Sequence, residues 1–144
     1  MISSILVVCI GNVCRSPMAE GVLRERIPSV ELSSAGIGAL VDKPAQDHAI
    51  ALMSERGIDI TTHRARQIVT PMCRDTDLIL VMDNEQKRVI EDNYVFTCGR
   101  VFRIGHFGNF DVPDPYGGPR RQFAESLDLI DSGVEAWAER IRGL

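Results

Sequence analysis

The sequence predicts an α/β fold in which helices cover a parallel β-sheet. Short runs of β-branched and other apolar residues alternate with longer segments of helical period, which is typical of such a fold. Two of the runs, 5–9 and 78–82, are almost continuously apolar, as expected of central strands buried on both faces. Two segments rich in Gly, Pro, Asn and Asp, 36–44 and 105–119, are predicted to be loops that carry function at the carboxyl ends of the strands.

Four strands are expected, at 5–9, 30–34, 78–82 and 101–104. The first and the third are the two continuous apolar runs. We therefore expect them to lie side by side in the sheet.

The first helix has a readable start. Ser16 is predicted to be its N-cap and Pro17 its first residue, because a hydroxyl side chain caps free N–H groups and proline suits the first turn. Three apolar residues then trace one face of the helix: Met18, Val22 and Ile27.

Three further helices are predicted. One runs from about 45 to 56 and ends at Gly57, and the next follows Asp83. The last has the clearest pattern, a stripe of apolar residues at three- and four-residue spacing: Phe123, Leu127, Ile130, Val134, Trp137 and Ile141. Trp137 is therefore expected in the core rather than in a ligand site.

The composition indicates a single domain spanning residues 1–144. The chain is 44% hydrophobic, with a mean hydropathy of −0.01 and a formal net charge of −4. The acidic balance argues against nucleic acid as a partner. The apolar run at 5–10 is too short to cross a bilayer and lacks the flanks of a signal peptide, so we expect no membrane insertion, a cytoplasmic location and reduced cysteines.

The chemistry is expected in the turn between the first strand and the first helix. Residues 9–16 of this turn read Cys9-Ile10-Gly11-Asn12-Val13-Cys14-Arg15-Ser16. Backbone N–H groups at a helix N-terminus form an anion site, and Gly and Asn tolerate the left-handed backbone that curls amides around an oxyanion. A cysteine thiol held there ionises readily, which makes Cys9 a candidate nucleophile. Arg15 offers a planar fork of donors for two phosphoryl oxygens.

A proton donor is expected in the late loop. Asp114 lies between two prolines that stiffen its loop, so it is the candidate general acid and base, with Asp111 as its rival. Tyr116 would stack on an aromatic substrate or wall the cleft. The sequence carries no metal-ligand motif beside the loop and no nucleotide-binding P-loop, and we expect neither a metal nor a cofactor.

Several segments together resemble one family. The string VCIGNVCRSPMAE at 8–20 resembles the low-molecular-weight protein tyrosine phosphatases, and the similarity continues at 33–36, 57–59, 63–67, 78–83 and 114–116. The resemblance implies a doubly wound, four-stranded parallel sheet in which Cys9 is the nucleophile, Arg15 binds phosphate and Asp114 is the general acid and base.

The resemblance also implies roles for neighbouring residues. Ser16 would hydrogen-bond the Cys9 thiolate and aid its departure. A network of three residues would hold the strained loop: Asn12, Ser34 and His63. Cys14 would trap Cys9 in a reversible disulfide, although a small hydrophobic residue that packs the loop would also suit this position.

The subfamily and the partner are implied in the same way. The pattern is most similar to bacterial members that act on autophosphorylated tyrosine kinases of polysaccharide export, so the expected partner is a phosphotyrosine protein, in one reading the cytoplasmic tail of a membrane kinase. Many members carry a second aromatic residue after Tyr116, where this chain has Gly117 and Gly118.

Three other functions share parts of this pattern. Arsenate reductases of the same fold need two further cysteines after the third strand, and none occurs before Cys98. Phosphoarginine phosphatases are associated with a small polar residue at the position of Val13. A catalytically silent phosphopeptide-binding module is the third alternative, disfavoured by intact Cys9, Arg15 and Asp114.

Other reactive or charged side chains receive no role. Cys73 and Cys98 match no motif, and His48 and His106 have no supporting context. Two arginines are interpreted most simply as solvated charges: Arg64 and Arg66.

Overall fold

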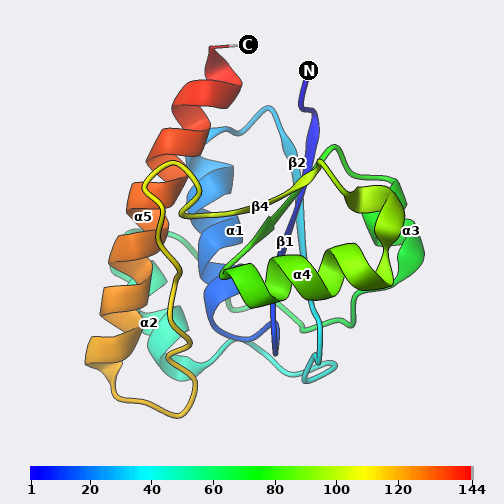
Figure 1. Cartoon of the computed structure of the whole chain (residues 1–144). Coiled ribbons are helices and arrows are strands. Elements are labelled where there is room, and N and C mark those ends of the chain that lie inside the picture. Colours follow the sequence, from blue (N-terminus) through cyan, green and yellow to red (C-terminus); the bar gives the residue numbers. More distant parts are fainter. Residues whose placement is uncertain (144) are drawn as a thin grey trace.

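A computed structural model describes residues 1–143 of the chain. Its centre is a four-stranded, all-parallel sheet in the order β2-β1-β3-β4 (Figure 1). The strands are β1 (Ser4–Cys9), β2 (Glu31–Gly36), β3 (Leu78–Val81) and β4 (Val101–Arg103). The doubly wound parallel sheet predicted from the sequence is confirmed, and β1 and β3 are neighbours at its centre.

The two faces of β1 build two separate cores. Ile5 and Val7 belong to the larger core, whereas Leu6 and Val8 belong to the smaller one on the opposite face. This follows from the two-residue period of a strand, and it explains why β1 is apolar at every position from Ile5 to Cys9.

Helices cover both faces of the sheet. The larger core lies under α1 (Arg15–Arg26), α2 (Asp47–Ser54) and α5 (Arg120–Arg142), and α1 packs against α5 (Figure 1). The smaller core lies under α3 (Thr70–Arg74), α4 (Asn84–Asn93) and the short 3₁₀ helix η1 (Val95–Thr97). The expected stripe of α5 is buried from Phe123 to Trp137, and Ile141 packs against its edge.

The start of α1 differs from the prediction. The helix begins at Arg15 with Cys14 as its N-cap residue, and no side chain caps it. Ser16 is not the cap, because its hydroxyl is engaged with Cys9 and Asn12 inside the preceding loop.

Other helix and strand boundaries also differ from the predicted ones. The α2 helix is shorter than expected, ending at Ser54, but hydrogen-bonded turns close the chain at Gly57, whose φ of 76° is the left-handed value predicted for a helix stop. The β2 strand starts and ends later than expected, since pairing with β1 extends to Gly36. The helices α3 and η1 were not predicted.

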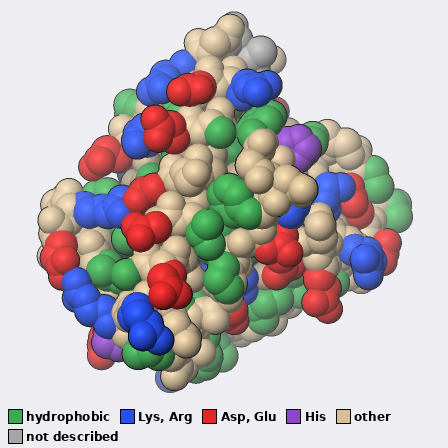
Figure 2. All heavy atoms as spheres, turned by 60° about the vertical axis from the view of Figure 1, so that its left-hand side comes forward, with side chains coloured by type: hydrophobic (Ala, Val, Ile, Leu, Met, Phe, Trp, Pro, Cys, Tyr) green, Lys and Arg blue, Asp and Glu red, His purple; other side chains and the backbone are tan. Residues whose placement is uncertain are grey.

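The loops converge at one end of the molecule. The carboxyl end of β1, the segment after β2 and the segment before α5 meet at the lower end in Figure 1. Within residues 1–143, no helix is long and apolar enough to cross a membrane. On the face drawn in Figure 2, positive and negative side chains are interspersed, so this face presents no extended basic surface.

Candidate active site

The centre of the site is the sulfur of Cys9, at the carboxyl end of β1. The backbone N–H of Asn12 donates to Cys9 Sγ at 3.3 Å, and Ser16 Oγ lies 3.0 Å from the same sulfur. Ser16 Oγ also accepts from the side-chain amide of Asn12 at 2.7 Å, which leaves the hydroxyl proton free to point at Cys9. Two hydrogen-bond donors therefore face the sulfur.

Asn12 holds the loop in its unusual shape. Its φ of 60° is left-handed, and its side chain is fully buried. The amide Nδ2 donates to Ser16 Oγ and to Ser34 Oγ at 3.1 Å, while Oδ1 accepts from the backbone N–H of Arg66 at 2.9 Å. One of these bonds closes the loop on Ser16, and the other two connect the loop to β2 and to the segment at Arg66.

His63 and Arg66 support Asn12 from outside. His63 Nε2 lies 2.6 Å from the carbonyl oxygen of Asn12, and because the carbonyl can only accept, Nε2 carries the proton. Arg66 is exposed, as expected of a solvated charge, but its Nε also donates to the carbonyl oxygen of Ser34 at 2.8 Å, which ties this arginine to the fold. The network predicted from Asn12, Ser34 and His63 is present, with Arg66 as a member that the sequence did not indicate.

Arg15 is buried beside the sulfur and is only partly neutralised. Its side chain is 3% exposed, and NH1 donates to the carbonyl oxygen of Val112 at 2.9 Å. Two carboxylates lie farther away, Asp114 at 3.5 Å from NH2 and Asp83 at 3.9 Å from NH1. Arg15 Nε is buried and has no hydrogen-bond partner among residues 1–143. Leaving such a donor unpaired costs about 1–3 kcal/mol or more, so the position is ready for an acceptor oxygen.

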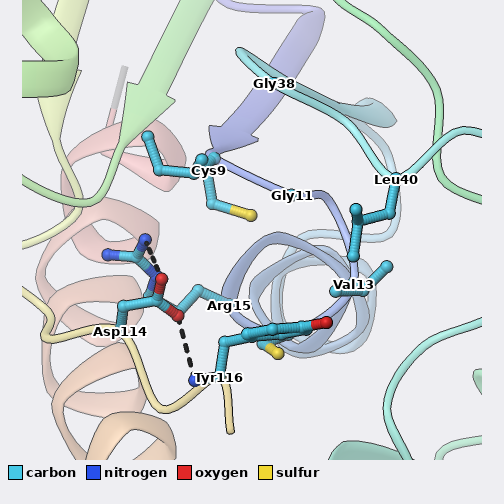
Figure 3. A pocket seen from close by; sticks show the side chains of 10 residues that line it. Cys9, Gly11, Val13, Arg15, Gly38, Leu40, Asp114 and Tyr116 are labelled. Carbon is cyan, nitrogen blue, oxygen red and sulfur yellow. Dashed lines mark hydrogen bonds and ion pairs between the residues drawn. The ribbon is translucent and has the colours of Figure 1, made fainter.

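These groups meet in a pocket of about 170 Å³ (Figure 3). Its wall comprises the loop of residues 9–15 with residues from two other loops: Gly38, Leu40, Asp114 and Tyr116. In Figure 3 the Tyr116 ring spans the mouth between Asp114 and Val13. The pocket thus joins a thiol and a guanidinium at its floor to an apolar rim.

The two candidate acids occupy different surroundings. Asp114 lines the pocket, and its Oδ1 accepts from the backbone N–H of Tyr116 at 3.1 Å, which positions the carboxyl over the floor. Asp111 instead pairs with Arg103 at 2.9 Å and does not line the pocket. The geometry therefore favours Asp114 over its rival.

Cys14 differs electrostatically from Cys9. Burial, and secondly the nearby Cys9 and Asp114, raise the pKa of the Cys14 thiol to about 12. Cys14 is therefore a neutral thiol near pH 7. The remaining cysteines lie outside the pocket, Cys73 buried and Cys98 exposed.

Some site residues could not be found from the sequence. Val112 contributes only a carbonyl oxygen, and Gly38 and Leu40 only wall, so no side-chain chemistry marks them. Asp83 was noted as a helix start, and its approach to Arg15 was not foreseen. Among residues 1–143 there is no group of three or more His, Cys, Asp or Glu side chains placed to hold a metal ion.

Comparison with known proteins agrees with this geometry. Residues 4–143 match the family described as low molecular weight phosphotyrosine protein phosphatase. The chain belongs to this family. The probable low molecular weight protein-tyrosine-phosphatase EpsP of Ralstonia nicotianae is 49% identical over all 144 residues, which cover 99% of its length. Membership makes the chain an enzyme of the protein-tyrosine-phosphatase class.

Solved structures of the phosphatase family superpose closely on this chain. The structure of Vibrio vulnificus Wzb in complex with benzylphosphonate matches with a TM-score of 0.94 at 36% identity. The match covers 97% of this chain and 99% of the Wzb chain. The YwlE arginine phosphatase from Geobacillus stearothermophilus also matches, with a TM-score of 0.91 at 30% identity over 97% of this chain and 93% of its own. The fold is thus shared by enzymes for two phosphorylated residues, and the substrate must be argued from the pocket.

Proposed function

We propose that this phosphatase hydrolyses phosphotyrosine in proteins through a phosphocysteine formed on Cys9. One observation carries the proposal. A sulfur that accepts two hydrogen bonds, an unpartnered arginine donor and a carboxyl group lie in a single pocket at a helix N-terminus. These are the nucleophile, the anion clamp and the proton donor that transfer of a phosphoryl group requires.

In the first step the Cys9 thiolate attacks phosphorus, and the bond to the tyrosine oxygen breaks. The loop amides and the guanidinium of Arg15, whose Nε has no partner among residues 1–143, hold the phosphoryl oxygens. Asp114 gives its proton to the leaving phenolate. Its place opposite the floor, held by the Tyr116 amide, suits an oxygen that departs away from Cys9.

In the second step water attacks the phosphocysteine, and Asp114 takes the proton from that water. The sulfur leaves as a thiolate, stabilised by the Ser16 hydroxyl and the Asn12 N–H. Inorganic phosphate then departs and the starting state is restored.

The rim supports an aryl substrate. Val13, Leu40 and Tyr116 surround the mouth with apolar area, and Tyr116 is 54% exposed and free to stack on a phenyl ring. Val13 is apolar where phosphoarginine phosphatases are associated with a small polar residue, which argues against a guanidinium leaving group. The related Wzb of Vibrio vulnificus was solved with benzylphosphonate, a phenyl-bearing phosphonate.

The arsenate reductase alternative lacks a redox relay. The region after β3 is the start of α4 and contains no cysteine before Cys98, which does not line the pocket. For the same reason the proposed redox role of Cys14 is limited to a disulfide with Cys9 that protects it from over-oxidation.

The proposed partner is the phosphorylated tail of a tyrosine kinase of polysaccharide export, met in the cytoplasm. The similarity to bacterial enzymes such as EpsP and Wzb supports this partner.

Matched aspartate variants test the proposal. Asp114→Asn is expected to lower kcat on a phosphotyrosine peptide by about 10²–10³-fold, within the range for loss of a general acid. The loss should shrink on an aryl phosphate with a good leaving group, since that leaving group needs no proton. Asp111→Asn is the control for charge and position, and it should retain activity on both substrates.

Two outcomes would overturn the assignment. Equal losses for Asp114→Asn on good and poor leaving groups would show a structural role. Wild-type protein that binds phosphopeptides without releasing phosphate would identify a silent binding module instead.

A further inference from the structure

A second hollow adjoins the catalytic pocket on the side of α4. It has a volume of about 250 Å³ and shares Ile10, Arg15 and Asp114 with the catalytic pocket. Its other walls come from the segment after β2 and the first turns of α4: Ile37, Asp83, Glu85, Gln86 and Val89. A chain whose phosphotyrosine occupies the catalytic pocket would pass directly over this hollow.

The hollow continues along α4. A third one, of about 330 Å³, shares Ile37 and Val89 with it. This last part is lined by amide, hydroxyl and apolar side chains: Gln67, Ile68, Ile90, Asn93 and Tyr94. Each hollow shares lining residues with the next, so the three are continuous. We call the two hollows outside the catalytic pocket the α4 groove.

The α4 groove contains a buried donor without a partner. Gln86 is 1% exposed, and its Oε1 accepts from the backbone N–H of Met82 at 2.9 Å. Because Met82 N–H can only donate, the orientation of the amide is defined, and Nε2 is the buried atom that has no partner in the described part of the chain. An unpaired buried amide is costly, and it points to a ligand oxygen such as a main-chain carbonyl.

The charge of the α4 groove near the catalytic pocket is negative. Three carboxylates, those of Asp83, Glu85 and Asp114, face one cation, Arg15. Arg15 lies within 3.9 Å of both Asp83 and Asp114, whereas Glu85 is exposed and forms no ion pair among residues 1–143. Glu85 is therefore the carboxylate available to a ligand.

We propose that the α4 groove binds the peptide segment that flanks the phosphotyrosine and selects a Lys or Arg close to it. The inference rests on the proposed function, since the phosphotyrosine anchors the segment. Ile37 and Val89 would contact the methylene stem of the basic side chain, Glu85 would pair with its charge, and Gln86 Nε2 would donate to a substrate carbonyl.

The test compares phosphotyrosine peptides that differ at one flanking position. At each of the four positions nearest the phosphotyrosine, two before it and two after it, three peptides are compared that carry Lys, Ala or Glu there. The value of kcat/KM is measured for each peptide at low salt. Wild-type enzyme is expected to prefer Lys over Ala by about two- to fivefold at one of these positions, the range for one partly exposed ion pair. Glu in that position should be the poorest.

Charge variants locate the effect. In Glu85→Gln the ratio of the Lys peptide to the Ala peptide should fall to about one, and in Glu85→Lys the Glu peptide should become the best substrate. Glu135→Gln is the matched control, because Glu135 is exposed on α5 and lines no part of the α4 groove. Its Lys to Ala ratio should equal that of the wild type.

Failure of this inference is distinct from failure of the proposed function. Hydrolysis of the Ala peptide with equal rates for Lys and Glu peptides would overturn the α4 groove and leave the phosphatase activity intact. A Lys preference that survives in Glu85→Lys would also overturn it. Without any hydrolysis the proposed function fails, and the same three peptides are then compared by their affinity for Cys9→Ser, where equal affinities reject the α4 groove.

Discussion

Replacing Asn12 by alanine is expected to destabilise the protein by about 4 kcal/mol. The side chain makes three buried hydrogen bonds, to Ser16, Ser34 and the N–H of Arg66, each worth about 1 kcal/mol net. The φ of 60° adds about 1 kcal/mol, because alanine adopts a left-handed backbone poorly whereas asparagine tolerates it.

Asn12→Gly separates the two contributions. Glycine loses the same three hydrogen bonds but accepts the left-handed backbone, so it should be more stable than the alanine variant by about 1 kcal/mol. Ordinarily glycine is the less stable of the two. Ser34→Ala removes a single bond to Asn12 and should cost about 1 kcal/mol.

The assay is urea unfolding followed by the fluorescence of Trp137, the only tryptophan, which is buried against the sheet. A stability order of wild type, then Asn12→Gly, then Asn12→Ala agrees with the argument. An alanine variant as stable as the glycine variant would refute the claim of backbone strain. A loss under about 1 kcal/mol in both would refute the importance of the hydrogen-bond network.

Three other perturbations test separate parts of the structure. Gly133→Ala would place a methyl group 2.4 Å from Ile104 Cγ2, so the midpoint of urea unfolding should fall by the equivalent of about 1–3 kcal/mol. An unchanged midpoint would contradict the packing of α5 on Ile104, the residue that follows β4. With a pKa of about 12, Cys14 is thiolate in only on the order of one molecule in 10⁴ or fewer near pH 7.5. Iodoacetamide should therefore label Cys9 before Cys14, as peptide mass spectrometry would detect, and earlier labelling of Cys14 would contradict this assignment. Arg56→Met removes a bidentate ion pair with Asp131 of α5 and should lower the free energy of unfolding by less than about 1 kcal/mol. The loss should fade in 1 M salt, where the screening length is only about 3 Å. A loss that persists at high salt would show that Arg56 acts by packing.

The elements with strong periodicity were predicted well. The continuous apolar runs of β1 and β3 and the long stripe of α5 each carry many consistent positions, so their identity does not depend on a partner. The end of β2 was misplaced because Ala35 and Gly36 have weak strand preference and become strand through pairing with Val8 and Cys9. The five residues of α3 are too few to show a period.

The site was predicted where side-chain chemistry marks a residue. Cys9, Arg15 and Asp114 were proposed because a thiol, a guanidinium and a carboxyl at those spacings have recognisable uses, and the structure brings the three into one pocket. The carbonyl of Val112, which holds Arg15 across 97 positions of sequence, and the amide of Arg66 are main-chain groups that every residue possesses. Only the folded chain brings them to the site.

Ser16 shows how a local rule can mislead. Serine before proline at a predicted helix start has the features of an N-cap, yet its hydroxyl lies between Asn12 and Cys9. The tertiary hydrogen bonds compete with the cap and prevail, because the loop places a sulfur and an amide within reach of the same oxygen.

The central claim is that Cys9 carries the phosphoryl group during turnover. Acid-quenching the reaction of wild-type enzyme with an aryl phosphate, followed by peptide mass spectrometry, tests it directly. A phosphate adduct on Cys9 that forms during turnover and is absent from Cys9→Ser is the predicted result. Steady release of phosphate by Cys9→Ser, or an adduct on another residue, would contradict it.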